Sequence, residues 1–164
     1  MELETWHAPP GERIPNHPRF AVLLYRGVDA AAAGAEAARR LFAEHDWGGA
    51  WVDGVLPFHH FHSTSHEALA VVAGRATLEL GGPEGRPFDV AAGDVVVLPA
   101  GTGHRRSSAE PAFTVVGAYP AGQEEYDLLR GDDPAEVAAA RERIARLGPP
   151  PEDPVGGEGV AGWR

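Results

Sequence analysis

The sequence predicts an all-β domain, a closed barrel or jelly roll, with two α-helices at its periphery. Gly and Pro contribute 21 and 15 of the 164 residues, and they lie between short apolar runs. That pattern is typical of many turns joining short strands. The middle of the chain holds five such runs with no helical pattern between them, which favours a barrel or jelly roll. Helical spacing occurs only in the two segments that flank this region.

The N-terminal region predicts an arm, a strand and a helix. Residues 1–18 are polar and interrupted by prolines, so we expect an extended arm. Phe20–Tyr25 (FAVLLY) is an apolar run of strand length. Asp29 can cap an Ala-rich helix that continues to about Glu44, where Gly48–Gly49 then break the pattern. The expected buried stripe of this helix consists of Ala33, Ala37, Leu41 and Phe42.

The central region predicts strands separated by turns. The segments between the apolar runs are rich in Gly, Pro, Ser and Asp, the residues that turns favour. Six glycines in these segments are expected to supply unusual backbone angles: Gly74, Gly81, Gly82, Gly93, Gly101 and Gly103. The predicted strands are Trp51–His62, Glu67–Val72, Ala76–Leu80, Asp94–Leu98 and Phe113–Tyr119.

The C-terminal region predicts a second helix and a loose tail. Asp133 can cap this helix and Pro134 suits its first position, while Gly148 and three prolines stop it after about Leu147. The composition of Pro149–Arg164 is typical of a loose segment. We expect one domain over 1–164, made of an N-terminal arm and helix (1–48), a barrel core (50–120) and a C-terminal helix and tail (121–164).

The composition of the chain indicates which binding partners and which cellular compartment to expect. The net charge of −10 argues against nucleic acid, because phosphate backbones are bound by an excess of Lys and Arg. The chain has no Cys, hence no disulfide, which fits a reducing cytosol. It shows neither a signal peptide pattern nor an apolar run of membrane-spanning length, so we expect no membrane partner and a cytoplasmic location.

A cluster of histidines predicts a metal site. Four of the eight histidines, His59, His60, His62 and His66, fall within eight residues. On a strand, His60 and His62 project from the same face. Glu67 begins the next predicted strand, and a hairpin would return it beside them. Two imidazoles and a carboxylate on one face suit a first-row divalent ion with open positions.

The neighbours of this cluster have less specific roles. Phe61 is expected to pack outside the site, and His59 to be a polar neighbour of the ligands. His66 is a candidate for catalysis as a proton carrier, with an exposed loop histidine as the alternative. Arg106 has the same strand parity as His104 and could bind a carboxylate or phosphate, although a solvated surface arginine is the favoured interpretation.

The remaining histidines and the aromatic residues favour structural roles. We interpret His7, His17 and His45 as hydrogen-bonded structural or surface residues. Core packing is likewise the favoured role of four aromatic residues that could instead line a cavity: Trp47, Trp51, Phe58 and Tyr119.

Two spaced motifs resemble those of the cupins. Gly54–Gly74 has glycine, five residues, His60, one residue, His62, four residues, Glu67, six residues and glycine, which resembles the first cupin motif. Gly93–His104 has glycine, five residues, PAG, two residues and His104, which resembles the second. The resemblance implies the cupin double-stranded β-helix, an RmlC-like jelly roll. It also implies one divalent metal ion held by His60, His62, Glu67 and His104.

The rest of the chain resembles the single-domain bacterial cupins of the YjlB type almost from end to end. Matching stretches include IPNHPRFAVLLY, HHFHSTSHEALAVVAG and GDVVVLPAGTGH. The chain departs from the second motif at Ser108, where cupins usually have Asn, and this puts local turn geometry in doubt. The resemblance implies a homodimer that pairs through barrel edges and N-terminal arms.

Three functions are compatible with such a site. The first is a metalloenzyme, a dioxygenase or isomerase acting on a small polar or anionic molecule. The second is a non-catalytic binding or sensing module in which the metal anchors a small ligand. The third is a structural metal, which predicts a closed site with no adjoining pocket. The ligands do not select among Fe, Mn, Zn, Ni, Co and Cu.

Overall fold

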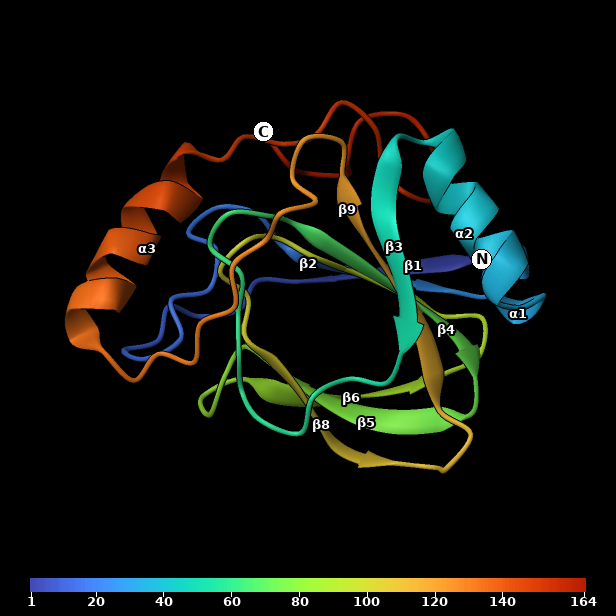
Figure 1. The fold of residues 1–164 in the computed structure, drawn as a ribbon, viewed down its shortest axis with the longest axis horizontal. Helices are drawn as coiled ribbons and strands as arrows, with labels where there is room; N and C mark the ends of the chain where they lie inside the picture. Colours follow the sequence, from blue (N-terminus) through green and yellow to red (C-terminus); the bar gives the residue numbers. More distant parts are fainter.

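A computed structural model, which describes residues 1–164, contains two antiparallel sheets (Figure 1). The large sheet has the strand order β1-β2-β7-β4-β9-β3 and the small sheet β6-β5-β8. The two are not hydrogen-bonded into one closed barrel, so the jelly-roll alternative is the one observed. The strands are β1 (Glu2–Trp6), β2 (Val22–Arg26), β3 (Trp47–Asp53), β4 (Glu67–Ala73), β5 (Arg75–Leu80), β6 (Arg86–Ala91), β7 (Val95–Leu98), β8 (His104–Ala109) and β9 (Thr114–Pro120).

The central strands of the large sheet are buried on both faces. A cluster between the sheets includes Leu69 of β4 and Leu78 of β5. A second cluster on the outer face includes Phe42 and Trp163, which come from a helix and from the C-terminal tail. Double burial explains why these strands are continuous apolar runs such as VLLYR and VVVL, whereas β5 alternates between exposed and buried residues.

Several strand boundaries differ from those expected. The strand predicted over Trp51–His62 is wrong at both ends, since β3 occupies Trp47–Asp53 and contains Gly48 and Gly49 instead of following them. The N-terminal arm contains β1, which pairs with β2. Strands β6 and β8 were not predicted, because their sequences RPFDVA and HRRSSA bury few residues. The other five predicted strands, including the one at Phe20–Tyr25, are present within a few residues.

The predicted N-terminal helix is two helices, α1 (Asp29–Ala32) and α2 (Ala35–Glu44). Gly34 separates them with a φ of 118°, which a residue with a side chain rarely adopts. Val28, not Asp29, is the N-cap, and it makes no side-chain capping bond. The fully buried residues are Ala31, Ala38 and Phe42, so the expected stripe is confirmed at Phe42. Leu41 is partly buried against the same cluster, whereas Ala33 is exposed.

The C-terminal helix α3 (Pro134–Arg146) matches its prediction. The Asp133 side chain accepts a hydrogen bond from the backbone N–H of Ala135, as an N-cap does. This helix lies on the opposite side of the molecule from α1 and α2 (Figure 1). No helix combines the length and apolarity needed to cross a membrane.

The tail after α3 is packed, which contradicts the prediction of a loose segment. Trp163 is 4% exposed, stacks on Phe20 and donates from Nε1 to the carbonyl of Ala21. Asp153 is buried and accepts a hydrogen bond from the Tyr25 hydroxyl. Composition favoured a loose tail because these few anchoring side chains are outnumbered by Gly and Pro, yet they are enough to hold the segment on the large sheet.

Candidate metal centre

Three histidines converge between the two sheets. His60 lies outside the regular strands, in the segment joining β3 to β4, and forms an isolated bridge with His104 at the start of β8. Each of the two backbone amides donates to the other residue's carbonyl, at 3.3 and 2.9 Å. His62 follows two residues later. Ring nitrogens of His60, His62 and His104 all lie within 4.8 Å of one another, and the three residues are 3–5% exposed.

Each of these imidazoles is held by a backbone carbonyl at Nδ1. His60 Nδ1 is 2.9 Å from the Phe58 oxygen, and His104 Nδ1 is 3.0 Å from the Thr102 oxygen. His62 Nδ1 bonds to the carbonyl of Asp127. A carbonyl can only accept, so in the neutral ring the proton is on Nδ1 and the lone pair is on Nε2. All three rings are therefore held in the tautomer that leaves Nε2 free to bind a metal ion.

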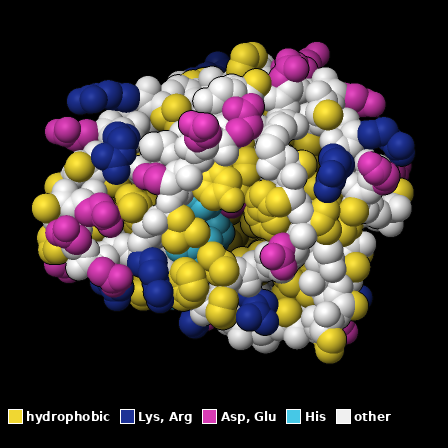
Figure 2. All heavy atoms as spheres, in the orientation of Figure 1, with side chains coloured by type: hydrophobic (Ala, Val, Ile, Leu, Met, Phe, Trp, Pro, Cys, Tyr) yellow, Lys and Arg dark blue, Asp and Glu magenta, His cyan; other side chains and the backbone are white.

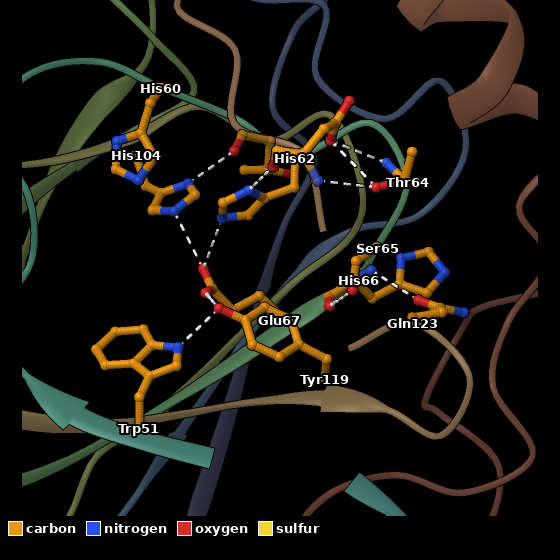
Figure 3. A network of polar contacts seen from close by, with 12 residues as sticks. Trp51, His60, His62, Thr64, Ser65, His66, Glu67, His104, Tyr119 and Gln123 are labelled. Carbon is orange, nitrogen blue, oxygen red and sulfur yellow. Dashed lines mark hydrogen bonds and ion pairs between the residues drawn. The ribbon is translucent and has the colours of Figure 1, made fainter. Parts of the chain in front are cut away.

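Glu67 contributes a carboxylate next to the histidines (Figure 3). Its Oε1 lies 3.1 Å from His104 Nε2 and 3.5 Å from His62 Nε2. Its Oε2 accepts a 2.7 Å hydrogen bond from the Tyr119 hydroxyl, which in turn accepts one from Trp51 Nε1 at 2.7 Å. One carboxylate oxygen thus faces the histidines, while the hydrogen bonds from Trp51 to Tyr119 and from Tyr119 to Glu67 hold the other.

Burial and charge shift the ionisation of this cluster. Burial lowers the pKa of His60 to about 3, and repulsion from His104 adds to the effect. Burial also lowers the pKa of His62, but the Glu67 charge and hydrogen bond reverse the shift and leave that pKa above its usual value. Burial raises the pKa of Glu67, yet His62 and His104 more than offset this and hold it far below its usual range. The carboxylate is therefore ionised at neutral pH.

A small cavity of about 70 Å³ adjoins the cluster and is lined by all four of these side chains. Its other lining residues are mostly apolar and include Val55, Leu69 and Tyr126. On the molecular surface, histidine side chains lie at the base of a hollow that hydrophobic side chains surround (Figure 2). Trp51 and Tyr119 line this cavity as well, so for these two the expected role in core packing alone is incomplete.

The donor set fits a divalent first-row metal ion. Three neutral imidazoles and one ionised carboxylate are ligands that Mn, Fe, Co, Ni, Cu and Zn all accept. The Nδ1 bonds to carbonyls are the outer contacts that metal-bound histidines ordinarily make. Three buried histidines that could hold a metal are present, and Glu67 lies within reach of two of them.

His66 lies outside this centre. It is fully buried, its Nδ1 accepts from the backbone N–H of Ala100, and its Nε2 is 2.9 Å from the Gly148 carbonyl. Both ring nitrogens are therefore occupied in joining the Pro99–Gly103 turn to the end of α3. Neither the proton carrier nor the exposed loop histidine that the sequence suggested is observed.

Arg106 also lies away from the histidines. Its Nε donates to the carbonyl of Val55, and its side chain lines a separate groove of about 420 Å³. Arg106 keeps the strand parity of His104, since the two pair with Leu78 and Leu80 of β5, but two residues further along β8 its side chain reaches Val55 and not the histidines. The register of β5 against β8 shifts only after this pair, between Thr77 and Leu78. Ser108 is exposed and pairs with Thr77 beside this irregularity.

Asp127 is a site residue that sequence reasoning missed. Besides its carbonyl bond to His62, its Oδ1 accepts from the backbone N–H of Ser63 at 2.6 Å, and its side chain also bonds Thr64. It thereby fixes the loop between His62 and Glu67. No local pattern marks Asp127, which lies more than 60 residues from its partners in a segment of irregular structure.

Comparison with known proteins identifies the class. A family model described as "Cupin domain" matches residues 51–116, which contain all four residues of the centre and most of the strands around it. The uncharacterized protein YjlB of Bacillus subtilis (strain 168) is 38% identical over 157 residues, 96% of this chain and 92% of YjlB. The chain belongs to the cupin family. Its similarity to YjlB extends over nearly the whole length of both proteins.

Solved cupin-like structures are similar only in part. An acireductone dioxygenase from Bacillus anthracis, with cadmium in its active center, is 13% identical with a TM-score of 0.40, covering 54% of this chain and 60% of that one. An oxalate decarboxylase from Lactobacillus farciminis is 19% identical with a TM-score of 0.42, covering 60% and 33%. Each match spans less than two thirds of the solved chain, and likenesses this low do not extend to function.

Proposed function

We propose that this cupin is a metalloenzyme that holds one divalent metal ion through His60, His62, Glu67 and His104 and acts on a small molecule in the adjoining cavity. The observation that carries the proposal is the shared tautomer of the three histidines. Each Nδ1 is bonded to a carbonyl, so three Nε2 lone pairs meet beside an ionised carboxylate. Folding alone does not require such an arrangement, because it sets the Nε2 lone pairs of His62 and His104 against the negative Glu67 carboxylate, and a cation between them would offset the repulsion.

The cavity favours a reactive or ligand-binding metal over a structural one. A structural site is closed by its protein ligands, whereas here all four side chains line an open volume of about 70 Å³. That volume holds about two water molecules, so only the reacting end of a substrate fits beside the histidines. The rest of a larger molecule would extend past Leu56, Tyr126 and Leu128, which are 39–43% exposed and also line the cavity.

The chain's own residues define the conditions for the reaction. A bound divalent metal would supply a Lewis acid that polarises an oxygen ligand or lowers the pKa of bound water, and iron would also permit dioxygen chemistry. Glu67 would offset part of the metal charge through Oε1, while Tyr119 keeps Oε2 turned away. The apolar walls would exclude water and strengthen electrostatic interactions with the substrate. This supports a dioxygenase or isomerase of a small polar or anionic molecule.

Metal content tests the metal site. Protein purified without added metal should contain about one equivalent of a first-row metal by elemental analysis, and H62A should lose most of it. The matched control is H7A, which removes an exposed histidine far from the site and should retain the wild-type content. Full metal loading of H62A would contradict the proposed ligand set.

Whether the protein consumes a small molecule or only binds it distinguishes an enzyme from a binding module. Wild-type protein and H62A would each be incubated in air with a mixture of small hydroxy and oxo acids, followed by proton NMR and an oxygen electrode. Loss of one acid with the wild type alone supports an enzyme, and simultaneous oxygen uptake identifies a dioxygenase, not an isomerase. An acid that raises the thermal stability of the wild type and is recovered unchanged would instead support a module that uses the metal as an anchor.

A further inference from the structure

A second cavity, of about 220 Å³, lies next to the metal centre but shares no lining residue with it. Its walls include three arginines, Arg13, Arg105 and Arg130, together with Phe58 and His59. Phe58 and His59 directly precede His60 in the chain. The three arginines come from the N-terminal arm, from β8 and from the segment between β9 and α3, so only the tertiary structure brings them together.

Such a gathering of positive charge is unexpected in this protein. The net charge is −10, and all 14 basic residues are arginines, since the sequence contains no lysine. Placing three of them around one cavity costs repulsion unless anions offset it. Arg13 pairs with Asp132 at 2.7 Å, and Arg105 pairs with Glu79 at 2.6 Å. Two carboxylates therefore offset two of the three guanidinium charges.

Arg130 remains without an acceptor. It makes no hydrogen bond or ion pair with the protein, and its guanidinium carbon lies 3.9 Å from the centre of the Phe58 ring. Stacking on an aromatic face orients a guanidinium while leaving its N–H donors at the edge free. The Phe58 ring thus holds Arg130 at the cavity with its donors unused.

His59 also lacks a partner on one side of its ring. Its Nε2 lies 3.5 Å from Glu79 Oε2, but its Nδ1 is buried and has no hydrogen bond. A buried polar atom without a partner is costly, and such atoms in native proteins are commonly satisfied by water or a ligand. The cavity is thus lined by one free guanidinium and two partly neutralised ones, and by His59, whose buried Nδ1 has no partner.

We propose that this cavity is a binding site for a small oxyanion, the phosphate or carboxylate group of a small molecule, with Arg130 as its principal ligand and Arg13, Arg105 and His59 around it. Arginine's planar fork of donors matches the oxygens of both groups. The volume of about 220 Å³ accommodates one such group with a short substituent. The proposal does not depend on the metalloenzyme function, because none of these side chains belongs to the metal centre.

Calorimetric titration tests the site in the full-length protein. Inorganic phosphate and malonate, the two probes, would be titrated at constant ionic strength into wild-type protein, R130Q and R39Q. Arg39 is an exposed arginine of α2 remote from this cavity, which makes R39Q the matched control. At least one probe should bind the wild type and R39Q equally, and R130Q should bind it about tenfold more weakly, the effect of losing one charge-assisted hydrogen-bond partner.

The two titrations also show which kind of anion binds, and a repeat without metal shows whether binding at this cavity depends on the metal centre. Tighter binding of phosphate than of malonate indicates a phosphorylated ligand, and the reverse order a carboxylate. The same titration after removal of metal with a chelator should give the same affinity. Equal binding by R130Q and wild type, binding that disappears with the metal, or no heat from either probe with the wild type would overturn the proposal.

Discussion

At the scale of single residues, backbone carbonyls determine which histidine nitrogens are available. Phe58, Thr102 and Asp127 each present a carbonyl to one imidazole, and none of these residues needs a particular side chain for that bond. Tyr119 has the corresponding role for Glu67, but it acts through its hydroxyl. The candidate ligand residues are visible in the sequence, whereas most of the groups that orient them are not.

The Tyr119 hydroxyl provides a residue-scale prediction. Y119F would leave Glu67 Oε2 and Trp51 Nε1 without their partner, so the carboxylate could rotate away from the histidines. We expect the metal affinity, measured by competition with a chromogenic chelator, to fall roughly 10- to 100-fold, as for other outer contacts of metal ligands. The free energy of unfolding should fall by about 1–3 kcal/mol.

Y25F is the matched control for this change. It removes a buried tyrosine hydroxyl that bonds Asp153 in the tail, far from the centre. It should lower stability without changing metal affinity. If Y119F and Y25F weaken metal binding equally, the effect of Y119F is one of general stability and not of Glu67 orientation.

At the scale of elements, the contact between β3 and β9 positions the aromatic wall of the cavity beside the candidate metal centre. Trp51 of β3 pairs with Gly117 of β9, and the indole ring lies over the glycine. A Cβ atom at Gly117 would come within 2.2 Å of that ring. The glycine is needed here for close approach, since it allows Trp51 to reach the Tyr119 hydroxyl.

G117A should therefore displace Trp51. We expect a loss of about 1–3 kcal/mol in the free energy of unfolding, the usual cost of overpacking, and a shift in tryptophan fluorescence. G48A is the control, because Gly48 lies on the same strand as Trp51 and a Cβ atom there meets nothing within 4 Å. Equal fluorescence and stability in the two variants would contradict the proposed contact.

At the scale of the whole molecule, buried histidines connect stability to pH. His17, in the N-terminal arm, is 5% exposed, and its Nδ1 accepts from the backbone N–H groups of Arg19 and Phe20. Burial lowers its pKa to about 3, with added repulsion from His66 and Arg19. The unfolded chain binds a proton here near pH 6.5 and the folded chain does not. The contribution of His17 is thus fully present above pH 6.5 and is lost progressively as the pH falls toward 3.

H17N should reduce this pH dependence, because the Asn Oδ1 can accept the same bonds but does not titrate. Between pH 7 and pH 5, the wild type should lose about 2 kcal/mol more of its unfolding free energy than H17N, measured by urea denaturation. H7N, which changes an exposed histidine, should follow the wild type. A parallel fall in stability for wild type and H17N would show that His17 is not protected from protonation in the folded state.

The sequence predicted the molecule best where one local signal was enough. The apolar runs of β2, β4, β7 and β9 and the cap of α3 at Asp133 are such signals, and so is the spacing of His60, His62, Glu67 and His104. Polar strands such as β8 gave no comparable signal. The tail was misjudged because a few buried anchors outweighed its composition.

By itself, the sequence determined the fold class and the candidate donor atoms, because apolar runs and motif spacing are properties of neighbouring residues. Tertiary structure alone decided how those donors are held and what surrounds them. The bridge from His60 to His104, the Asp127 anchor and the three arginines beside Phe58 all join segments that are distant in the chain. Such contacts depend on how the sheets and loops pack, and no spacing along the chain encodes them.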